Sequence, residues 1–67
     1  MTTIDDFNRA LAATCTERQR LIIQLRYTEF MKWRDIGMLV GLSESAALRD
    51  SQRAFERVRI FLEGEAA

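Results

Sequence analysis

The sequence predicts a small all-α protein, a single four-helix domain over residues 1–67 that contains a helix-turn-helix. Three observations support this fold class. The chain has no proline and 48% of its residues are apolar, a composition that favours a compact helical core. Its apolar residues recur at spacings of three and four. Two such patterns flank Gly41-Leu42-Ser43, where a residue suited to ending one helix is followed closely by one suited to capping the next. The two helices are therefore expected to meet at a steep angle.

The first two helices are expected at about residues 3–14 and 17–28. Thr3 is the expected N-cap of the first helix, because two aspartates follow it and favour the positive end of a helix. The second helix begins with a capping box, in which Thr16 is the cap and Gln19 reaches back to it. Its expected inward residues are Leu21, Ile22 and Leu25.

The third and fourth helices are expected at about residues 32–40 and 44–63. Gly37 costs a helix ~1 kcal/mol relative to alanine, so we expect the backbone of another helix to pass close to it. Ser43 is the expected cap of the fourth helix, and Gly64 is expected to end that helix. The expected inward stripe of the fourth helix comprises Ala47, Leu48, Ala54, Phe55, Val58, Phe61 and Leu62.

The composition excludes several classes of protein. Cys15 is the only cysteine and there are no histidines, so disulfide scaffolds and zinc fingers are excluded, and no metal or other cofactor is expected. No nucleophile and base lie at a convincing spacing, so we expect neither an enzyme nor a small-molecule substrate. The acidic N-terminus lacks a long apolar run, so neither a signal peptide nor a membrane span is expected, and the reducing cytoplasm is the expected location.

The segment from Thr16 to Arg59 resembles region four of bacterial sigma factors, a four-helix module. The resemblance rests on Glu17-Arg18-Gln19-Arg20, Leu25-Arg26-Tyr27, Glu29, Asp35-Ile36-Gly37, Val40-Gly41-Leu42-Ser43-Glu44-Ser45, Arg53-Ala54 and Arg57-Val58-Arg59. It implies a module that binds the promoter −35 element and docks on a subunit of RNA polymerase. The sequence departs from the family pattern in places: Phe30 stands at a usual turn glycine, Lys32 at a capping serine or threonine, and Leu48 at an arginine that commonly contacts the promoter.

The resemblance and the helical angles together define candidate residues for binding double-stranded DNA. They are Ser43, Ser45, Arg49, Gln52, Arg53, Lys32, Arg34 and Arg57. Arg49 can form a bidentate pair with guanine and Gln52 with adenine, each worth ~1 to 3 kcal/mol of discrimination. The remaining basic side chains are expected to contact phosphates. The alternative is an ordinary solvated helix face.

Other residues of the fourth helix leave the interpretation open. Arg53 and Arg57 can instead pair with Glu56 or Asp50 along the helix, at a few tenths of a kcal/mol each. Asp50 is expected to be solvated, where it would repel phosphate. Leu48 is expected at the edge of the core, and if it were exposed it could contact a thymine methyl group or a protein partner.

Ten basic residues balance ten acidic ones, so the formal net charge is zero, which counts against tight DNA binding by a monomer. The leading hypothesis is therefore a transcriptional regulator that reads DNA as a homodimer. The rival hypothesis is a helix-turn-helix that has lost DNA reading and binds RNA polymerase, a sigma factor or another protein, as a phage- or plasmid-encoded inhibitor would. The expected patch for a dimer or partner comprises Phe30, Met31, Trp33 and Ile60.

Overall fold

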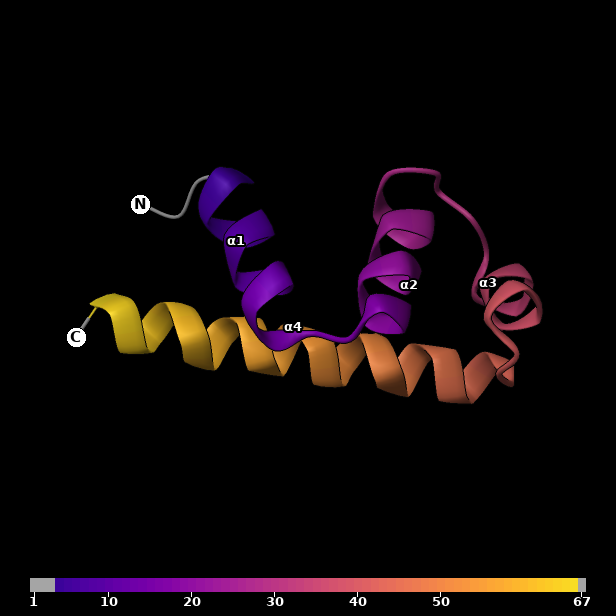
Figure 1. Cartoon of the computed structure of the whole chain (residues 1–67). Coiled ribbons are helices and arrows are strands. Elements are labelled where there is room, and N and C mark those ends of the chain that lie inside the picture. The colour runs from indigo at the N-terminus through magenta and orange to yellow at the C-terminus, as the bar shows by residue number, and fades with distance from the viewer. Residues whose placement is uncertain (1–3, 67) are drawn as a thin grey trace.

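The computed structural model describes residues 4–66, and every regular element in that range is an α-helix. The helices are α1 (Ile4–Thr14), α2 (Glu17–Tyr27), α3 (Trp33–Val40) and α4 (Glu44–Ala66) (Figure 1). The predicted all-α fold of four helices is confirmed. The expected cap Thr3 lies outside the described residues.

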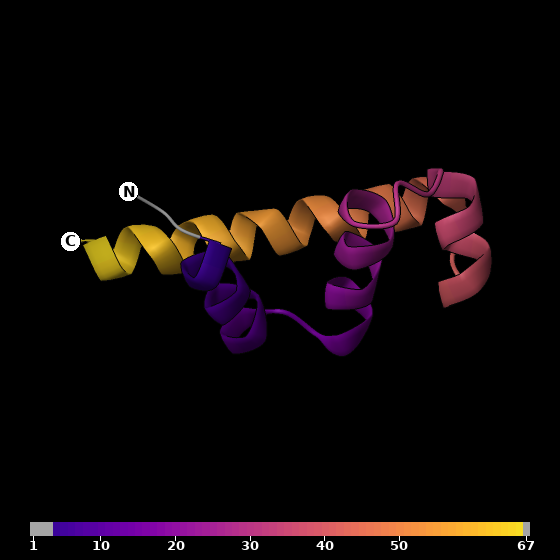
Figure 2. The same ribbon diagram turned by 90° about the horizontal axis from the view of Figure 1, so that it is seen from above.

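Helix α4 is the long element on which the other three helices pack. Figure 1 shows α1 over the C-terminal half of α4, whereas α2 and α3 lie over its N-terminal half. The view from above shows the same order along α4 (Figure 2). The domain is elongated as a result, with extents of 38 × 19 × 16 Å.

The core consists of two clusters along α4. One contains Ala10, Leu11, Ile23, Ala54 and Val58, and the other contains Ile22, Ile36 and Ala47. Neighbouring residues of α2 therefore enter different clusters, which centres the buried face of that helix between Ile22 and Ile23. The expectation that Leu21 points inward is wrong, because its side chain is turned away from both clusters and is 43% exposed.

The C-terminal end of α4 also differs from the expectation. Gly64 does not end the helix, which continues to Ala66. The carboxylate of Glu65 accepts a hydrogen bond from Arg9 Nη2 at 2.7 Å, and this contact ties the last turn of α4 to α1. A helical glycine costs only ~1 kcal/mol, so one contact with a neighbouring helix can offset it.

Candidate nucleic-acid interface

The corner between α3 and α4 is held by direct contact between backbones. Gly41 has a φ of 75°, the left-handed conformation expected of a glycine that ends a helix. The amide of Leu42 donates to the carbonyl oxygen of Gly37 at 2.8 Å. A Cβ atom on Gly37 would lie 2.6 Å from the carbonyl oxygen of Leu42. A backbone does pass close to Gly37, but the expectation that it belongs to another helix is wrong, because the approaching atoms belong to the turn at Leu42 and Ser43.

The start of α4 is capped as predicted. The hydroxyl oxygen of Ser43 accepts a hydrogen bond from the amide of Ala46 at 3.1 Å. This contact fixes the first turn of α4 against the corner, since it satisfies one of the amides that a helix start leaves unpaired. Lys32, at the corresponding position of α3, makes no capping hydrogen bond with its side chain.

Beyond this cap, the N-terminal half of α4 presents a polar face to solvent. The exposed side chains on it are Ser45, Arg49, Gln52 and Arg53. Lys32 and Arg34, at the start of α3, are also exposed. Within residues 4–65, none of the four cations at the corner (Lys32, Arg34, Arg49 and Arg53) forms an ion pair.

Asp50 is buried, which corrects the expectation of a solvated carboxylate beside the reading face. It is 6% exposed and faces the first turn of α2. One carboxylate oxygen accepts from Arg18 Nε at 3.0 Å, and the other accepts from Gln19 Nε2 at 3.2 Å. Its charge is thus covered from solvent and compensated by Arg18, whose side chain is itself about half exposed. Asp50 also lines a small hollow with Arg49 and Arg53.

Gln19 joins the start of α2 to two turns of α4. Its Oε1 atom accepts from the backbone amide of Thr16 at 3.0 Å, and its own backbone amide donates to Thr16 Oγ1 at 3.1 Å. The predicted capping box is therefore confirmed. Gln19 Oε1 also accepts from Arg57 Nη1 at 3.3 Å, and the same Arg57 nitrogen donates to the carbonyl oxygen of Thr14 at 3.4 Å. Arg57 therefore contacts the last residue of α1 and the first turn of α2, and not Glu56 or Asp50 as the alternative interpretation expected. The sequence identified Gln19 as a capping residue only.

The acidic residues of the C-terminal half of α4 have arginine partners. Arg59 pairs with Glu56 and, at 2.9 Å, with Glu63. Its hydrogen bond to Glu56 holds the pKa of that carboxyl group below the ordinary value. Arg9 likewise lowers the pKa of Glu65 through a hydrogen bond. Arginines therefore compensate the acidic groups at this end of the helix.

The expected partner patch does not form one surface. Phe30 is 83% exposed in the connection before α3, with a φ of 57°. Met31 and Trp33 are half-buried against the cluster of Ile22, Ile36 and Ala47. Ile60 is 57% exposed and borders a different hollow with Thr14, Arg57 and Phe61.

Leu48 is 38% exposed, more than expected for a residue at the edge of the core. It contributes to a shallow hollow of about 440 Å³ at the corner between α3 and α4. The other residues that line this hollow are Trp33, Ser43, Glu44 and Ser45. The sequence gave the position of Leu48 on the helix but not the hollow, because the hollow requires α3 to lie beside it.

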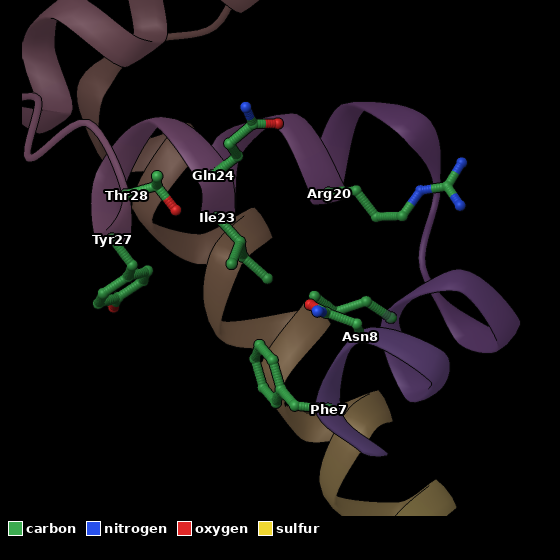
Figure 3. A pocket seen from close by; sticks show the side chains of 8 residues that line it. Phe7, Asn8, Arg20, Ile23, Gln24, Tyr27 and Thr28 are labelled. Atoms are coloured by element: carbon green, nitrogen blue, oxygen red, sulfur yellow. The ribbon is translucent and has the colours of Figure 1, made fainter. Parts of the chain in front are cut away.

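A second hollow, of about 470 Å³, lies between α1 and α2 and was not expected from the sequence (Figure 3). Phe7 and Tyr27 lie on its two sides, and both rings contact Phe55 of α4, with centroids at 6.1 and 5.4 Å. Arg20 and Gln24 from α2 lie along the upper side of the hollow in Figure 3. This hollow lies near the middle of α4, where Phe55 is, and away from the corner.

Comparisons with known protein-family models, curated proteins and solved structures found no significant match. No helix within the described residues is long and apolar enough to cross a membrane. The function is therefore argued from the geometry of the corner and from the sequence resemblance.

Proposed function

We propose that the protein binds double-stranded DNA through the N-terminal half of α4 and regulates transcription in the manner of a sigma-region-four-like helix-turn-helix. The observation that carries the proposal is the arrangement of charge at the corner. Arg49 and Arg53 are exposed without ion-pair partners among residues 4–65, while Asp50 between them is turned inward and paired. An exposed cationic face on a helix start is what phosphate and base contacts require.

In the proposed complex, α4 enters the major groove with its first turns against the bases. Arg49 forms a bidentate pair with guanine, and Gln52, three residues later on the same face, reads adenine. Arg53 and the two cations at the start of α3, Lys32 and Arg34, contact phosphates and set the register. Ser45 lies one turn before Arg49, close to the bases. Ser43 contributes by capping α4, and Arg57 by fixing α4 to the end of α1 and the start of α2.

A second copy of the chain completes the proposal. The three cations proposed to contact phosphates in each chain support only modest affinity at physiological salt, because affinity rises with the number of phosphates that are neutralised. A homodimer doubles that number and binds two half-sites about one helical turn of DNA apart.

The rival function, a protein-binding module that contacts RNA polymerase or another transcription protein, is favoured by one specific observation. Met38 and Leu39 on α3 are 73% and 64% exposed, and Phe30 before the same helix is 83% exposed. Apolar residues gathered on and beside one short helix are typical of a protein contact. This module would require no cationic face on α4.

The experiment that separates the two functions is selection of bound duplexes from a random pool at controlled salt, followed by substitution of Arg49. We expect a defined site to be selected and Arg49→Ala to weaken binding to it by roughly 5- to 150-fold, since a bidentate base contact is worth about 1 to 3 kcal/mol. Arg20→Ala is the matched control, because it removes the same charge from the hollow between α1 and α2 and should leave affinity for the site nearly unchanged.

The salt dependence of the wild-type protein gives a second measurement. For a DNA-binding protein the logarithm of the affinity falls with the logarithm of the salt concentration by about 0.9 for each phosphate contacted, so the three phosphate contacts of Lys32, Arg34 and Arg53 give a slope of roughly −2.7 per chain. Equal losses in Arg49→Ala and Arg20→Ala, or weak binding to DNA at every salt concentration, would refute DNA reading and favour the protein-binding module.

A further inference from the structure

One feature of the corner does not serve phosphate or guanine binding. Leu48 precedes Arg49 on α4, and its side chain is 38% exposed in the hollow that it lines with Trp33, Glu44 and Ser45. An exposed leucine beside an aromatic ring has no hydrogen bonds to give up, so covering it with an apolar group is favourable. The hollow is thus a small apolar surface within a face that is otherwise polar.

The wall of this hollow is fixed before any ligand arrives. The guanidinium carbon of Arg26 lies 4.9 Å from the centroid of the Trp33 ring. Arg26 Nη1 also donates to the carbonyl oxygen of Met31 at 3.0 Å, so both the Trp33 ring and this carbonyl hold the guanidinium group in place. Trp33 therefore keeps its place beside Leu48, and a ligand need not order it on binding.

The lining of the hollow indicates which part of DNA it can accept. Glu44 at the rim repels phosphate, so the sugar-phosphate backbone is a poor occupant. In the major groove, the apolar group on a base edge is the 5-methyl group of thymine, which leucine can contact. The hydroxyl of Ser45 can donate to the neighbouring O4 atom of the same base.

We propose that the hollow between Leu48 and Trp33 takes the 5-methyl group of a pyrimidine, next to the base read by Arg49. This specificity rests on the proposed function, because the methyl group is reached only if α4 enters the major groove. Thymine and 5-methylcytosine both carry the group. Thymine also offers its O4 atom as an acceptor for the hydroxyl of Ser45. At that place 5-methylcytosine has an amino group, which can donate a hydrogen bond to the carboxylate of Glu44.

The test uses the duplex selected above, with each thymine replaced in turn by deoxyuridine, which lacks only the methyl group. At one position we expect the wild-type protein to lose about fourfold in affinity, the factor that corresponds to burying one methyl group. In Leu48→Ala the two duplexes should bind equally at that position, while the dependence on Arg49 is retained. Where the selected site holds cytosine there, 5-methylation should raise wild-type affinity by the same factor.

Leu39→Ala is the matched control, because it shortens an exposed leucine of α3 that does not line the hollow. It should keep the full preference for thymine over deoxyuridine. Circular dichroism of both variants checks that the helices are intact, and the partial exposure of both leucines predicts that they are.

The outcomes separate this inference from the function on which it rests. A selected site that depends on Arg49 but is insensitive to methyl removal at every position overturns the inference alone. A methyl preference that persists in Leu48→Ala also overturns it. Failure to select any site, together with Leu48-dependent binding to a transcription protein, overturns both the inference and the proposed function.

Discussion

Replacing Gly37 by alanine would show how strongly the α3–α4 corner depends on contact between backbones. Helix propensity alone favours alanine by ~1 kcal/mol. The added Cβ would lie 2.6 Å from the carbonyl oxygen of Leu42 and 3.2 Å from the carbonyl carbon of Ser43. Both are backbone atoms, and the turn cannot simply move away because the amide of Leu42 is bonded to the carbonyl of Gly37. Overpacking of this kind costs about 1–3 kcal/mol and is expected to exceed the gain in propensity.

We therefore expect Gly37→Ala to lower the free energy of unfolding by up to ~2 kcal/mol net. For a domain of this size, each kcal/mol shifts the melting temperature by about 4–8 °C. The change is measured by urea and thermal unfolding followed by circular dichroism. The expected loss is a large fraction of the total free energy of unfolding, which is roughly 3–10 kcal/mol for a chain of 67 residues.

Gly64→Ala is the control, since Gly64 is also helical but a Cβ there would meet nothing within 4 Å. This variant should be stabilised by up to ~1 kcal/mol through propensity alone. If Gly37→Ala were stabilised by a similar amount, the backbone contact at the corner would not constrain α4 and the reasoning would be refuted.

Further predictions concern a buried carboxylate, a strained residue and an exposed ion pair. Asp50→Ala should lower the free energy of unfolding by ~1–3 kcal/mol, because Gln19, 3% exposed, loses the acceptor for its Nε2 group. Asp50→Asn, which retains an acceptor oxygen, should cost less in the same urea titration. Phe30→Gly should raise the melting temperature relative to Phe30→Ala, since only glycine adopts a φ of 57° without a penalty of ~1–2 kcal/mol. The pKa of Glu65 is lowered by Arg9, so this pair stabilises the fold above the ordinary glutamate pKa of 4.5 and the stabilisation is lost as pH falls through the lower folded value. Unfolding of Glu65→Gln should therefore depend less steeply on pH below 4.5 than that of the wild type, and equal pH profiles would contradict the role of the pair.

The parts of the fold that depend on neighbouring residues could be predicted from the sequence. The capping box of Thr16 and Gln19 and the glycine corner at Gly41 form within a few residues, so their chemistry is visible in the sequence. At Phe30, where the resembled family has glycine, the sequence allowed either a loop of another shape or a strained residue, and the φ of 57° corresponds to the second.

The features that were missed depend on how helices pack. The periodicity of α2 allows either Leu21 or Ile23 to point inward. Ile23 is the buried one because α4 lies on that side of α2 and places Ala54 and Val58 against it. Asp50 follows an exposed arginine on α4, and its burial requires Arg18 and Gln19, which lie more than thirty residues earlier. No local signal joins those residues, so the carboxylate could not be placed from the sequence.

The zero net charge of the chain, which counted against DNA binding, loses much of its weight once the acidic groups are placed. Interactions between exposed charges are largely screened beyond about 8–10 Å at physiological salt, so the charge near the corner matters more than the total. Along α4, Glu63 lies roughly 21 Å from Arg49 at 1.5 Å per residue, well beyond that distance. Asp50, which is close, is buried and paired with Arg18. Glu44, five residues before Arg49, and Asp35 on α3 are exposed carboxylates near the corner and cancel part of its positive charge. The four exposed cations Lys32, Arg34, Arg49 and Arg53 still outnumber them, a local excess that a count over the whole sequence averages away.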